Sequence, residues 1–531
     1  MSKERLLLSS GMFVDGTGAT PPRLADVLIE GGRVEAVIDR GTGDQAAPSE
    51  ADGRPPDLSA RALDCSGALV VPGFIDIHTH SDLTWISTPG CDSRVTQGIT
   101  TEVCGNCGMS PAPNDGADPH FRATISVIDQ DPEAPLPFSS FGEYLAELAA
   151  RRAAVNIAPL VGHGSARQTA IARGGGKAGP KEVASLVAEA LRAGAWGTSL
   201  GLMYPPGESA GRDELLAVAS VTGSSGALLS AHMRDYEGSG LTTSVREVCS
   251  LAGATGAHLE LSHLRVVRGE GAFVVDRCLE LLEAAGPDVH GDAYPYTAGQ
   301  TTLFQLLTPA LRREGVAAFL AARQAERGRY AEAFAAGGFE PSDITVVRVR
   351  AGADRASVGR TLATCAAASG LHWSEEAVEL LWRSGGYVDV VVVGSRMEEQ
   401  ATILAHPKVM IGSDGFSVSL DYPAAIHPRA FGAFPRALRM LVDGGTTWEQ
   451  AIAKATSMPA AKAGLDGRGV LRPGARADIA VIEPDVLDAR ATYDQPLQPS
   501  SGVRHVLTSG VPVLESGRQT GARPGRLLLR G

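Results

Sequence analysis

Residues 70–80 read VVPGFIDIHTH, a short apolar run that ends in His78 and His80. Side chains two positions apart on an extended strand point to the same side. Both imidazoles can therefore reach one metal ion from the end of a single strand. Taken alone, the HTH pattern is also compatible with chance or with core packing.

Seven further apolar runs of similar length follow, and helical stretches separate them. The helical text includes FGEYLAELAARRA (141–153) and PKEVASLVAEALRAG (180–194). Alternating strands and helices predict a parallel sheet, and eight such units close a (β/α)8 barrel. The eight predicted strands are 70–78, 100–104, 155–163, 197–202, 227–232, 258–263, 288–296 and 409–414.

The two ends of the chain have a different sequence pattern, in which short runs of alternating apolar and polar residues are joined by turns. We expect residues 1–70 and 466–531 to form one small β-sandwich domain around a TIM-like barrel at 71–465. The connection after the seventh strand is far longer than an ordinary loop and carries helical text. We therefore predict an inserted subdomain at about 298–400, between strands seven and eight of this α/β fold.

Residues able to bind a metal end most of the predicted strands. Besides His78 and His80, the candidates are Cys104 or Cys107, His163, His232, His263 and Asp414. In barrel enzymes the active site lies at the carboxyl ends of the strands, so these side chains should converge. A ligand set of nitrogen, sulfur and carboxylate groups suits zinc.

Composition narrows the possible partners and compartment. The chain has 531 residues, 44% of them hydrophobic and 20% charged, as in soluble globular proteins. Its net charge of −12 and the lack of a basic block argue against nucleic acid or an anionic membrane as partner. Seven scattered cysteines indicate a reducing, cytoplasmic location rather than a disulfide framework. The oligomeric state stays open.

Longer motifs resemble the N-acyl-D-amino-acid deacylase (D-aminoacylase) family of the amidohydrolase superfamily, in order and over almost the whole chain. They are FIDIHTHSDL (74–83), GITTEVCGNCGMSPAP (98–113), SLGLMYPPG (199–207), SAHMRDYEG (230–238), LSHLRVVRGEG (261–271), DAYPYTAG (292–299), MIGSDG (410–415) and HPRAFGAFPR (427–436). The tail LRPGARADIAV (471–481) is similar to the closing β segment of the superfamily.

The resemblance implies a division of the metal ligands. Cys107, His232 and His263 would form a tight zinc site, and His78, His80 and Asp414 a second, weaker one. Many binuclear relatives instead bridge two metals with a carbamylated lysine on strand four. This chain has no lysine between 181 and 408, and a thiolate is a natural replacement. Cys104 could substitute for Cys107, although burial in the core is its simpler interpretation.

The resemblance also implies roles in catalysis and substrate binding. Asp414 would accept a proton from water and return it to the leaving amine. Tyr204 and Arg429 would hold the α-carboxylate of the substrate, with Tyr294 as a further lining residue. His163 could stabilise the oxyanion or brace the ligands.

The sequence departs from the family pattern at two positions near the site. Arg265 stands where the family has lysine, and Tyr236 looks like an insertion after His232. Both changes put the identity of the substrate in doubt, whereas the metal ligands are unaffected.

These observations favour zinc-dependent hydrolysis of an N-acyl-D-amino acid or a related N-acyl amide. One alternative is a cyclic-amide hydrolase of the hydantoinase or dihydroorotase kind, which generally uses the lysine that this chain lacks. The other is a scaffold without catalytic activity, although such proteins lose ligands and this chain keeps every expected one.

Overall fold

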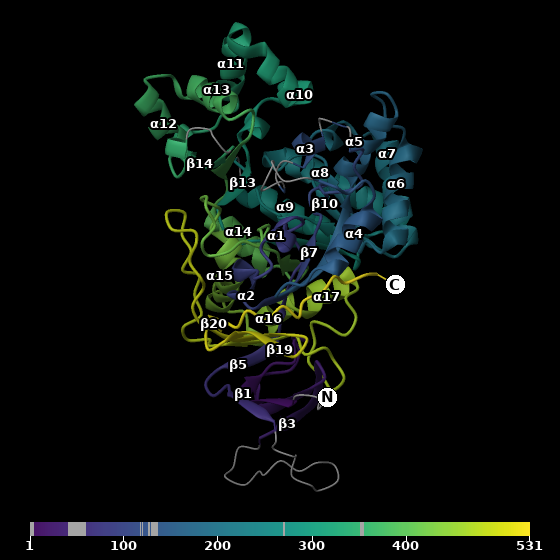
Figure 1. Cartoon of the computed structure of the whole chain (residues 1–531), viewed down its shortest axis with the longest axis vertical. Helices are drawn as coiled ribbons and strands as arrows, with labels where there is room; N and C mark the ends of the chain where they lie inside the picture. Colours follow the sequence, from purple (N-terminus) through teal and green to yellow (C-terminus); the bar gives the residue numbers. More distant parts are fainter. Residues whose placement is uncertain are drawn as a thin grey trace.

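Eight parallel strands form a barrel in the middle of the molecule (Figure 1). The computed structural model describes residues 5–40, 60–116, 118, 121–125, 128, 136–268, 271–350 and 355–530. The barrel strands, in the order in which they pair, are β6 (Phe74–Asp76), β7 (Ile99–Cys104), β8 (Asn156–Gly162), β9 (Gly197–Gly201), β10 (Leu228–His232), β11 (His258–Leu261), β12 (Val289–Ala293) and β16 (Val409–Ile411). Seven of them lie within a predicted run and β7 begins one residue before its run, so the predicted fold class is confirmed.

The barrel closes between its first and last strands, just beyond their carboxyl ends. The amide of Asp414 donates to the carbonyl of His78 over 2.8 Å, and the amide of His80 donates to the carbonyl of Gly415 over 2.8 Å. Thr79 and Gly415 form a parallel bridge between these bonds. The backbone of the predicted metal ligands thus forms the seam of the barrel.

Helices surround the barrel, and local sequence signals set where they begin and end. α4 (Phe141–Ala150) begins at Ser140, whose side chain accepts from the amide of Glu143 in a capping box. α6 (Pro180–Ala193) has proline at its first position and ends at Gly194. Gly194 has φ 114°, a conformation that favours glycine. The buried faces of these helices pack on the strands and form the largest hydrophobic core of the molecule.

Strands from both ends of the chain form one nine-stranded sheet below the barrel (Figure 1). β5 (Leu69–Pro72) pairs with β17 (Ile479–Ile482) in antiparallel fashion, which joins the two ends. The other strands are β1 (Arg5–Phe13), β2 (Arg23–Glu30), β3 (Arg33–Asp39), β4 (Arg61–Asp64), β18 (Val503–Thr508), β19 (Val511–Glu515) and β20 (Arg518–Gln519). The sheet encloses a core of its own that draws on both ends of the chain, including Phe13 and Val481.

The last residues leave this sheet and run along the barrel. The amides of Gly525 and Leu528 donate to the carbonyls of Ala153 and Ile157, each over 2.8 Å. The indole of Trp196 donates to the carbonyl of Leu528 over 2.7 Å. Because Ala153, Ile157 and Trp196 lie at the starts of β8 and β9, the tail covers the end of the barrel opposite the ligands.

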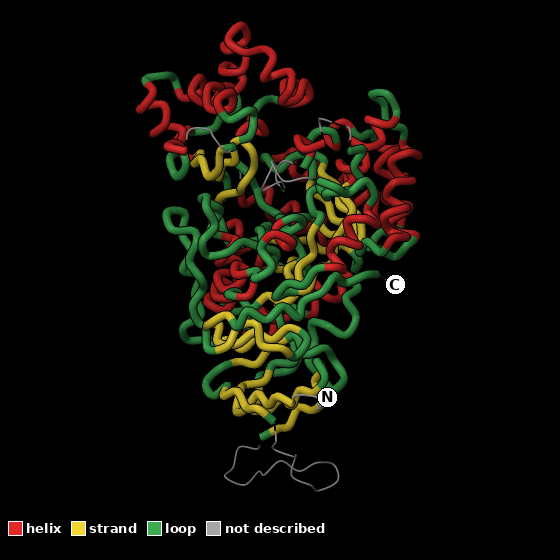
Figure 2. The backbone as a smooth tube through the Cα atoms, in the orientation of Figure 1, coloured by secondary structure: helices red, strands yellow, loops and turns green. Residues whose placement is uncertain are grey.

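The chain between β12 and β16 forms a separate lobe at the other end of the molecule (Figure 2). Its three-stranded antiparallel sheet consists of β13 (Ala298–Thr302), β14 (Ile344–Val349) and β15 (Val388–Val393). Its longer helices are α10 (Pro309–Ala322), α11 (Arg327–Ala336), α12 (Leu362–Ser369) and α13 (Trp373–Arg383). The lobe has its own hydrophobic core, and α14 (Met397–Ala405) after it already packs on α9 (Gly271–Ala284) of the barrel.

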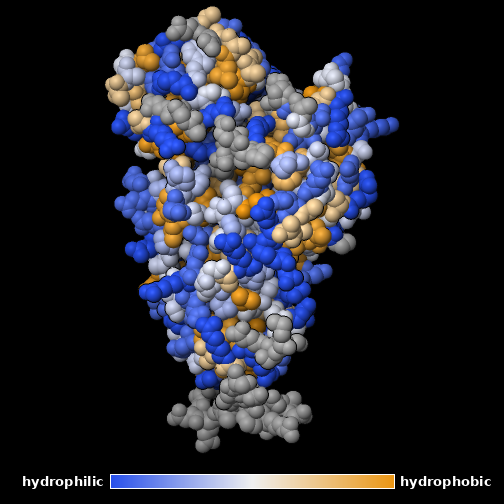
Figure 3. Space-filling model, viewed as in Figure 1, coloured by the Kyte–Doolittle hydropathy of each residue, from blue (hydrophilic) through white to orange (hydrophobic). Residues whose placement is uncertain are grey.

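The face of the molecule in Figure 3 is mostly hydrophilic, with scattered apolar patches. Among the helices in the described part of the chain, none is long and apolar enough to cross a membrane.

Candidate metal centre

Six predicted ligands meet at the carboxyl ends of the barrel strands. His232 is the last residue of β10, and His263 follows β11. His78 and His80 follow β6, Cys107 follows β7, and Asp414 follows β16. Their candidate ligand atoms form two sets within which all atoms lie within 4.8 Å of one another. One set is His78, His80, Cys107 and Asp414, and the other is Cys107, His232 and His263.

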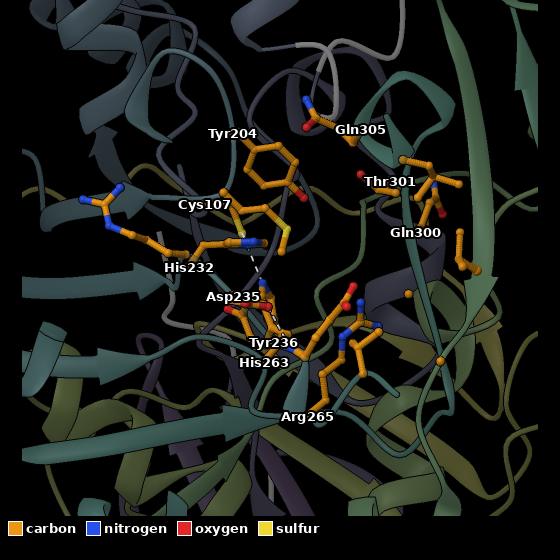
Figure 4. Close-up of a pocket in the computed structure, with 18 of the residues that line it drawn as sticks. Cys107, Tyr204, His232, Asp235, Tyr236, His263, Arg265, Gln300, Thr301 and Gln305 are labelled. Carbon is orange, nitrogen blue, oxygen red and sulfur yellow. Dashed lines mark hydrogen bonds between the residues drawn. The ribbon is translucent and has the colours of Figure 1, made fainter. Parts of the chain in front are cut away.

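Cys107 is the member that the two sets share. Its Sγ lies 3.4 Å from the Nε2 atoms of both His78 and His263, and 3.3 Å from the Nδ1 of His232. Figure 4 shows His232 and His263 pointing toward this sulfur from neighbouring strands. A cysteine between three imidazoles can bind one ion or bridge two.

Asp414 belongs to the set with His78 and His80, and its two oxygens face different partners. Its Oδ1 lies 3.1 Å from the Nε2 of His80 and 3.7 Å from that of His78. Its Oδ2 lies 2.6 Å from Nη1 of the buried Arg429. Burial opposes the ionisation of Asp414, but Arg429 and the histidines outweigh it and hold the pKa of the carboxyl well below its usual range.

Three of the ligands have a backbone conformation that side chains rarely adopt. The φ angles are 55° at Cys107, 35° at His263 and 53° at Asp414. Such angles cost energy and concentrate at functional sites. The glycine before this cysteine loop is equally constrained, since a Cβ on Gly105 would lie 2.1 Å from the carbonyl oxygen of Leu160. The CGNCG sequence therefore fits a tight loop that turns the thiol toward the histidines.

The protonation states of the ligands fit a cation at the centre. Burial lowers the pKa of His232 to about 3 and that of His263 well below its usual range, so both imidazoles are neutral. Burial also raises the pKa of the Cys107 thiol well above its usual range. A thiolate is stable there only with a positive charge beside its sulfur. Imidazole, thiolate and carboxylate together match zinc.

The buried carboxyl group of Asp292 orients His78 from behind, and the buried Glu260 lies close to both residues. The Nδ1 of His78 lies 3.0 Å from Oδ2 of Asp292, and Oδ1 of Asp292 accepts from the amide of His263 over 3.1 Å. Burial raises the pKa of Asp292 to about 7 and that of Glu260 well above its usual range. Sequence reasoning missed both residues. The signal for Asp292 was its place at the end of the seventh strand, in DAYPY.

Tyr236 holds the two histidines of the second set in place. Its ring lies 5.0 Å from that of His232 and 5.2 Å from that of His263, between centroids. Its hydroxyl accepts from the amide of Met233 over 3.1 Å and donates to the carbonyl of Ser262 over 3.2 Å. Tyr236 is therefore buried beside His232 and His263, as Figure 4 shows.

The cluster of candidate ligands opens into a cavity of about 410 Å³ between the barrel and the lobe. Tyr204, Arg265 and Tyr294 line it, as expected of substrate-binding residues. Nη1 of Arg265 donates to the Tyr294 hydroxyl over 3.0 Å. Arg429 lies 4.8 Å from the centroid of the Tyr294 ring, with 2% of its surface exposed, and it faces Asp414. The lobe supplies one wall of the cavity, which includes Gln300, Thr301, Gln305, Leu306, Leu307 and Phe339.

Two candidates lie apart from the cluster. The Nε2 of His163 lies 2.8 Å from Oε1 of Glu214, which also pairs with Arg167. Cys104 is buried, and its Sγ lies 4.0 Å from the hydroxyl of Tyr144. Neither belongs to a group of potential ligands in the described part of the chain. For His163, the contact with Glu214 argues against a direct role in stabilising the oxyanion.

A buried arginine lies beneath the seam of the barrel, and sequence reasoning did not find it. Nη1 of Arg94 donates to Oδ2 of Asp76 and to the hydroxyl of Ser413, each over 2.8 Å. Its Nη2 donates to the carbonyl of Phe416 over 3.0 Å. Asp76 precedes His78 by two residues and Ser413 precedes Asp414, so this network fixes the two strands that carry the ligands.

Comparison with known proteins places this architecture in a family. Residues 61–514 match the model of the amidohydrolase family. The chain is 34% identical to N-acyl-D-glutamate deacylase from Alcaligenes xylosoxydans xylosoxydans, over 99% of this chain and 96% of the relative.

Two solved structures have the same fold over nearly their whole length. N-acyl-D-glutamate deacylase from Bordetella bronchiseptica, in complex with zinc and a phosphonate mimic of the tetrahedral intermediate, superposes with a TM-score of 0.81 at 30% identity and 100% coverage of both chains. D-aminoacylase, an enzyme with a binuclear metal centre, superposes with a TM-score of 0.80 at 30% identity and 99% coverage of both chains. The chain thus belongs to the amidohydrolase family, in its branch of N-acyl-D-amino-acid deacylases.

Proposed function

We propose that this protein is a zinc-dependent hydrolase that cleaves the amide bond of an N-acyl-D-amino acid into a carboxylate and a free amine. The observation that carries the proposal is the contact of one cysteine, Cys107, with three histidines at the base of the cavity. The full-length similarity to a zinc-containing deacylase supports it.

The two ligand sets suggest one tight and one weaker zinc site. Cys107, His232 and His263 would hold the tight ion, because neutral imidazoles and a thiolate are strong zinc ligands. His78, His80 and Asp414 would hold the weaker one, with Cys107 shared. When bound, zinc acts as a Lewis acid on the amide carbonyl and makes water more acidic.

Asp414 moves the proton in this proposal. It is ionised at neutral pH, because Arg429 and the histidines more than offset its burial. Its Oδ1 faces the centre while Arg429 holds Oδ2, so the carboxylate has a fixed orientation. The carboxylate accepts a proton from the attacking water and then donates it to the leaving nitrogen, as a general base followed by a general acid.

The α-carboxylate of the substrate would bind on the wall formed by Arg265, Tyr204 and Tyr294. Arg265 fits this role because its guanidinium faces the cavity, and a planar guanidinium matches a carboxylate. Arg429 packs on the Tyr294 ring and pairs with Asp414, so it would contribute by fixing both side chains. Tyr204 would close the pocket over the metal, since its ring centroid lies 4.7 Å from that of His232.

Cyclic amides are a poorer match for this site than linear ones. Hydantoinase-like enzymes generally bridge two metals with a carbamylated lysine on strand four, and β9 has the sequence GTSLG. A scaffold without activity does not account for an intact ligand set at the base of a cavity.

All seven cysteines are free, which supports a reducing compartment such as the cytoplasm.

An activity screen tests the proposal. The zinc-loaded protein is assayed on matched N-acetyl-D- and N-acetyl-L-amino acids and on cyclic imides, with the release of amine or carboxylate as the readout. We expect turnover of D substrates that Asp414→Asn abolishes. Turnover of cyclic imides alone, or zinc-loaded protein without activity on any of these amides, would overturn it.

A further inference from the structure

Four arginine side chains line the cavity, and three of them are already paired within the chain. The four are Arg234, Arg265, Arg268 and Arg312. A substrate carboxylate that enters a closed cavity loses its water and needs a cation in return. The number of guanidinium groups still available therefore limits how many carboxylates a substrate can carry.

Each nitrogen of the Arg234 guanidinium already has a partner on the protein. Its Nε lies 2.9 Å from Oε2 of Glu247. Its Nη1 donates to the carbonyl of Glu208 over 2.8 Å and its Nη2 to that of Ala210 over 2.7 Å. This guanidinium holds two loops together, and its positive charge is already paired with Glu247.

Arg268 and Arg312 connect the barrel to the lobe. Arg268 pairs with Glu237, donates to the carbonyl of Gly337 and lies 4.2 Å from the centroid of the Phe339 ring. Nη2 of Arg312, on α10, lies 3.5 Å from Oε2 of Glu208, and its Nη1 donates to the carbonyl of Gln305 over 3.1 Å. Each of these arginines thus has a glutamate as its counter-ion.

Arg265 differs from the other three. Its side chain donates to the neutral hydroxyl of Tyr294, 3.0 Å away, and in the described part of the chain no carboxylate lies within ion-pair distance of it. Asp235 also lines the cavity, with Oδ1 accepting from the amide of Glu237 over 2.8 Å, and no described cation pairs with it. The cavity therefore offers one free positive group and one free negative group.

We infer that this enzyme selects N-acyl-D-amino acids with a single carboxylate and an uncharged side chain. The inference rests on the proposed function and names the substrate class of that site. Arg265 would take the α-carboxylate. A second carboxylate would lose its water with no guanidinium left to receive it, and it would meet the negative charge of Asp235. Although the chain is 34% identical to an N-acyl-D-glutamate deacylase, its substrates would then differ from those of that relative.

Substrates that differ only in charge test the inference. We expect the zinc-loaded protein to hydrolyse N-acetyl-D-glutamine with a kcat/KM at least about tenfold that for N-acetyl-D-glutamate. We expect the same preference for N-acetyl-D-asparagine over N-acetyl-D-aspartate. An equal or higher kcat/KM for the acidic members would overturn the inference and leave the proposed function intact. If the protein hydrolyses none of these four substrates and also fails on N-acetyl-D-leucine, both the inference and the proposed function are overturned.

A variant that frees the guanidinium of Arg312 from its counter-ion provides a second test of the inference. Glu208→Gln removes the counter-ion of Arg312, so the preference for glutamine over glutamate should narrow by about threefold or more. The kcat/KM for N-acetyl-D-glutamine reports whether the variant has folded. The matched control is Glu326→Gln, which removes the same charge from an exposed pair with Arg329 in the lobe and should leave the preference unchanged. A preference in folded Glu208→Gln equal to that of the wild type would contradict the inference.

Discussion

The Sγ of Cys107 lies 3.4 Å from the Nε2 of His78, and this contact joins the two sets of potential ligands into one cluster. Replacing this cysteine should therefore affect both sets. We expect Cys107→Ala to lower zinc affinity by about 100-fold or more and to abolish activity. Zinc content after dialysis, measured by mass spectrometry, gives the result. Cys104→Ala is the matched control, because Cys104 lies three residues earlier and contacts Tyr144 instead. Full zinc content in Cys107→Ala would refute the assigned centre.

Replacing Asp414 should separate catalysis from folding. Asp414→Asn keeps the size of the side chain and removes the proton acceptor, so kcat should fall by a factor of about 100 to 10,000. The circular dichroism spectrum should stay that of the folded protein, whereas the melting temperature should fall, because the buried Arg429 loses its counter-ion. Unchanged turnover would exclude Asp414 as the general base.

Zinc binding should tighten as the pH rises. Because burial raises the pKa of Cys107 well above its usual range, the thiol of the metal-free protein is protonated at neutral pH. His232 and His263 are already neutral, so binding releases the thiol proton alone. The association constant should then rise about tenfold per pH unit between about pH 6 and pH 8. Competition with a chromophoric chelator measures this slope. A flat profile would mean that Cys107 binds no zinc.

The aromatic ring of Tyr236 should contribute more to metal binding than its hydroxyl. Tyr236→Ala removes the ring between His232 and His263, and zinc affinity should fall by about 10- to 100-fold. Tyr236→Phe keeps the ring and loses only the hydrogen bonds to Met233 and Ser262, so its loss should be smaller. Equal zinc affinities for the two variants would contradict this order.

Arg94 should stabilise the fold without taking part in the reaction. Arg94→Met leaves Asp76 buried without its cation, so the free energy of unfolding should fall by about 3–5 kcal/mol. Denaturant titration measures the loss. Arg329→Met removes an exposed pair and serves as the control, with no measurable change expected. Equal stability of the two variants would show that the buried network is not what holds the seam closed.

The sequence predicted the parts of the molecule that depend on local pattern. Apolar runs with polar ends located all eight barrel strands and the residues that meet above them. The pattern of a single chain cannot show long-range pairing, so the contacts of Asp292 with His78 and of Glu247 with Arg234 were not foreseen.

The backbone conformation of the site was equally out of reach of sequence reasoning. Nothing in the residue types of Cys107 or His263 indicates a positive φ, because glycine normally takes such positions. The sequence predicted the lobe as an insertion, because the connection is long and has a helix-forming sequence. Its part in the cavity wall depends on how it folds back over the barrel, and that is a tertiary relationship.

The seam between His78 and Asp414 has a consequence for biosynthesis. The two residues that join the first and last barrel strands are separated by most of the polypeptide, including the whole lobe. A nascent chain on the ribosome therefore holds the early ligands long before their last partner has been made. The complete set of candidate ligands can bind metal only near the end of translation, so fragments released early would lack the complete centre.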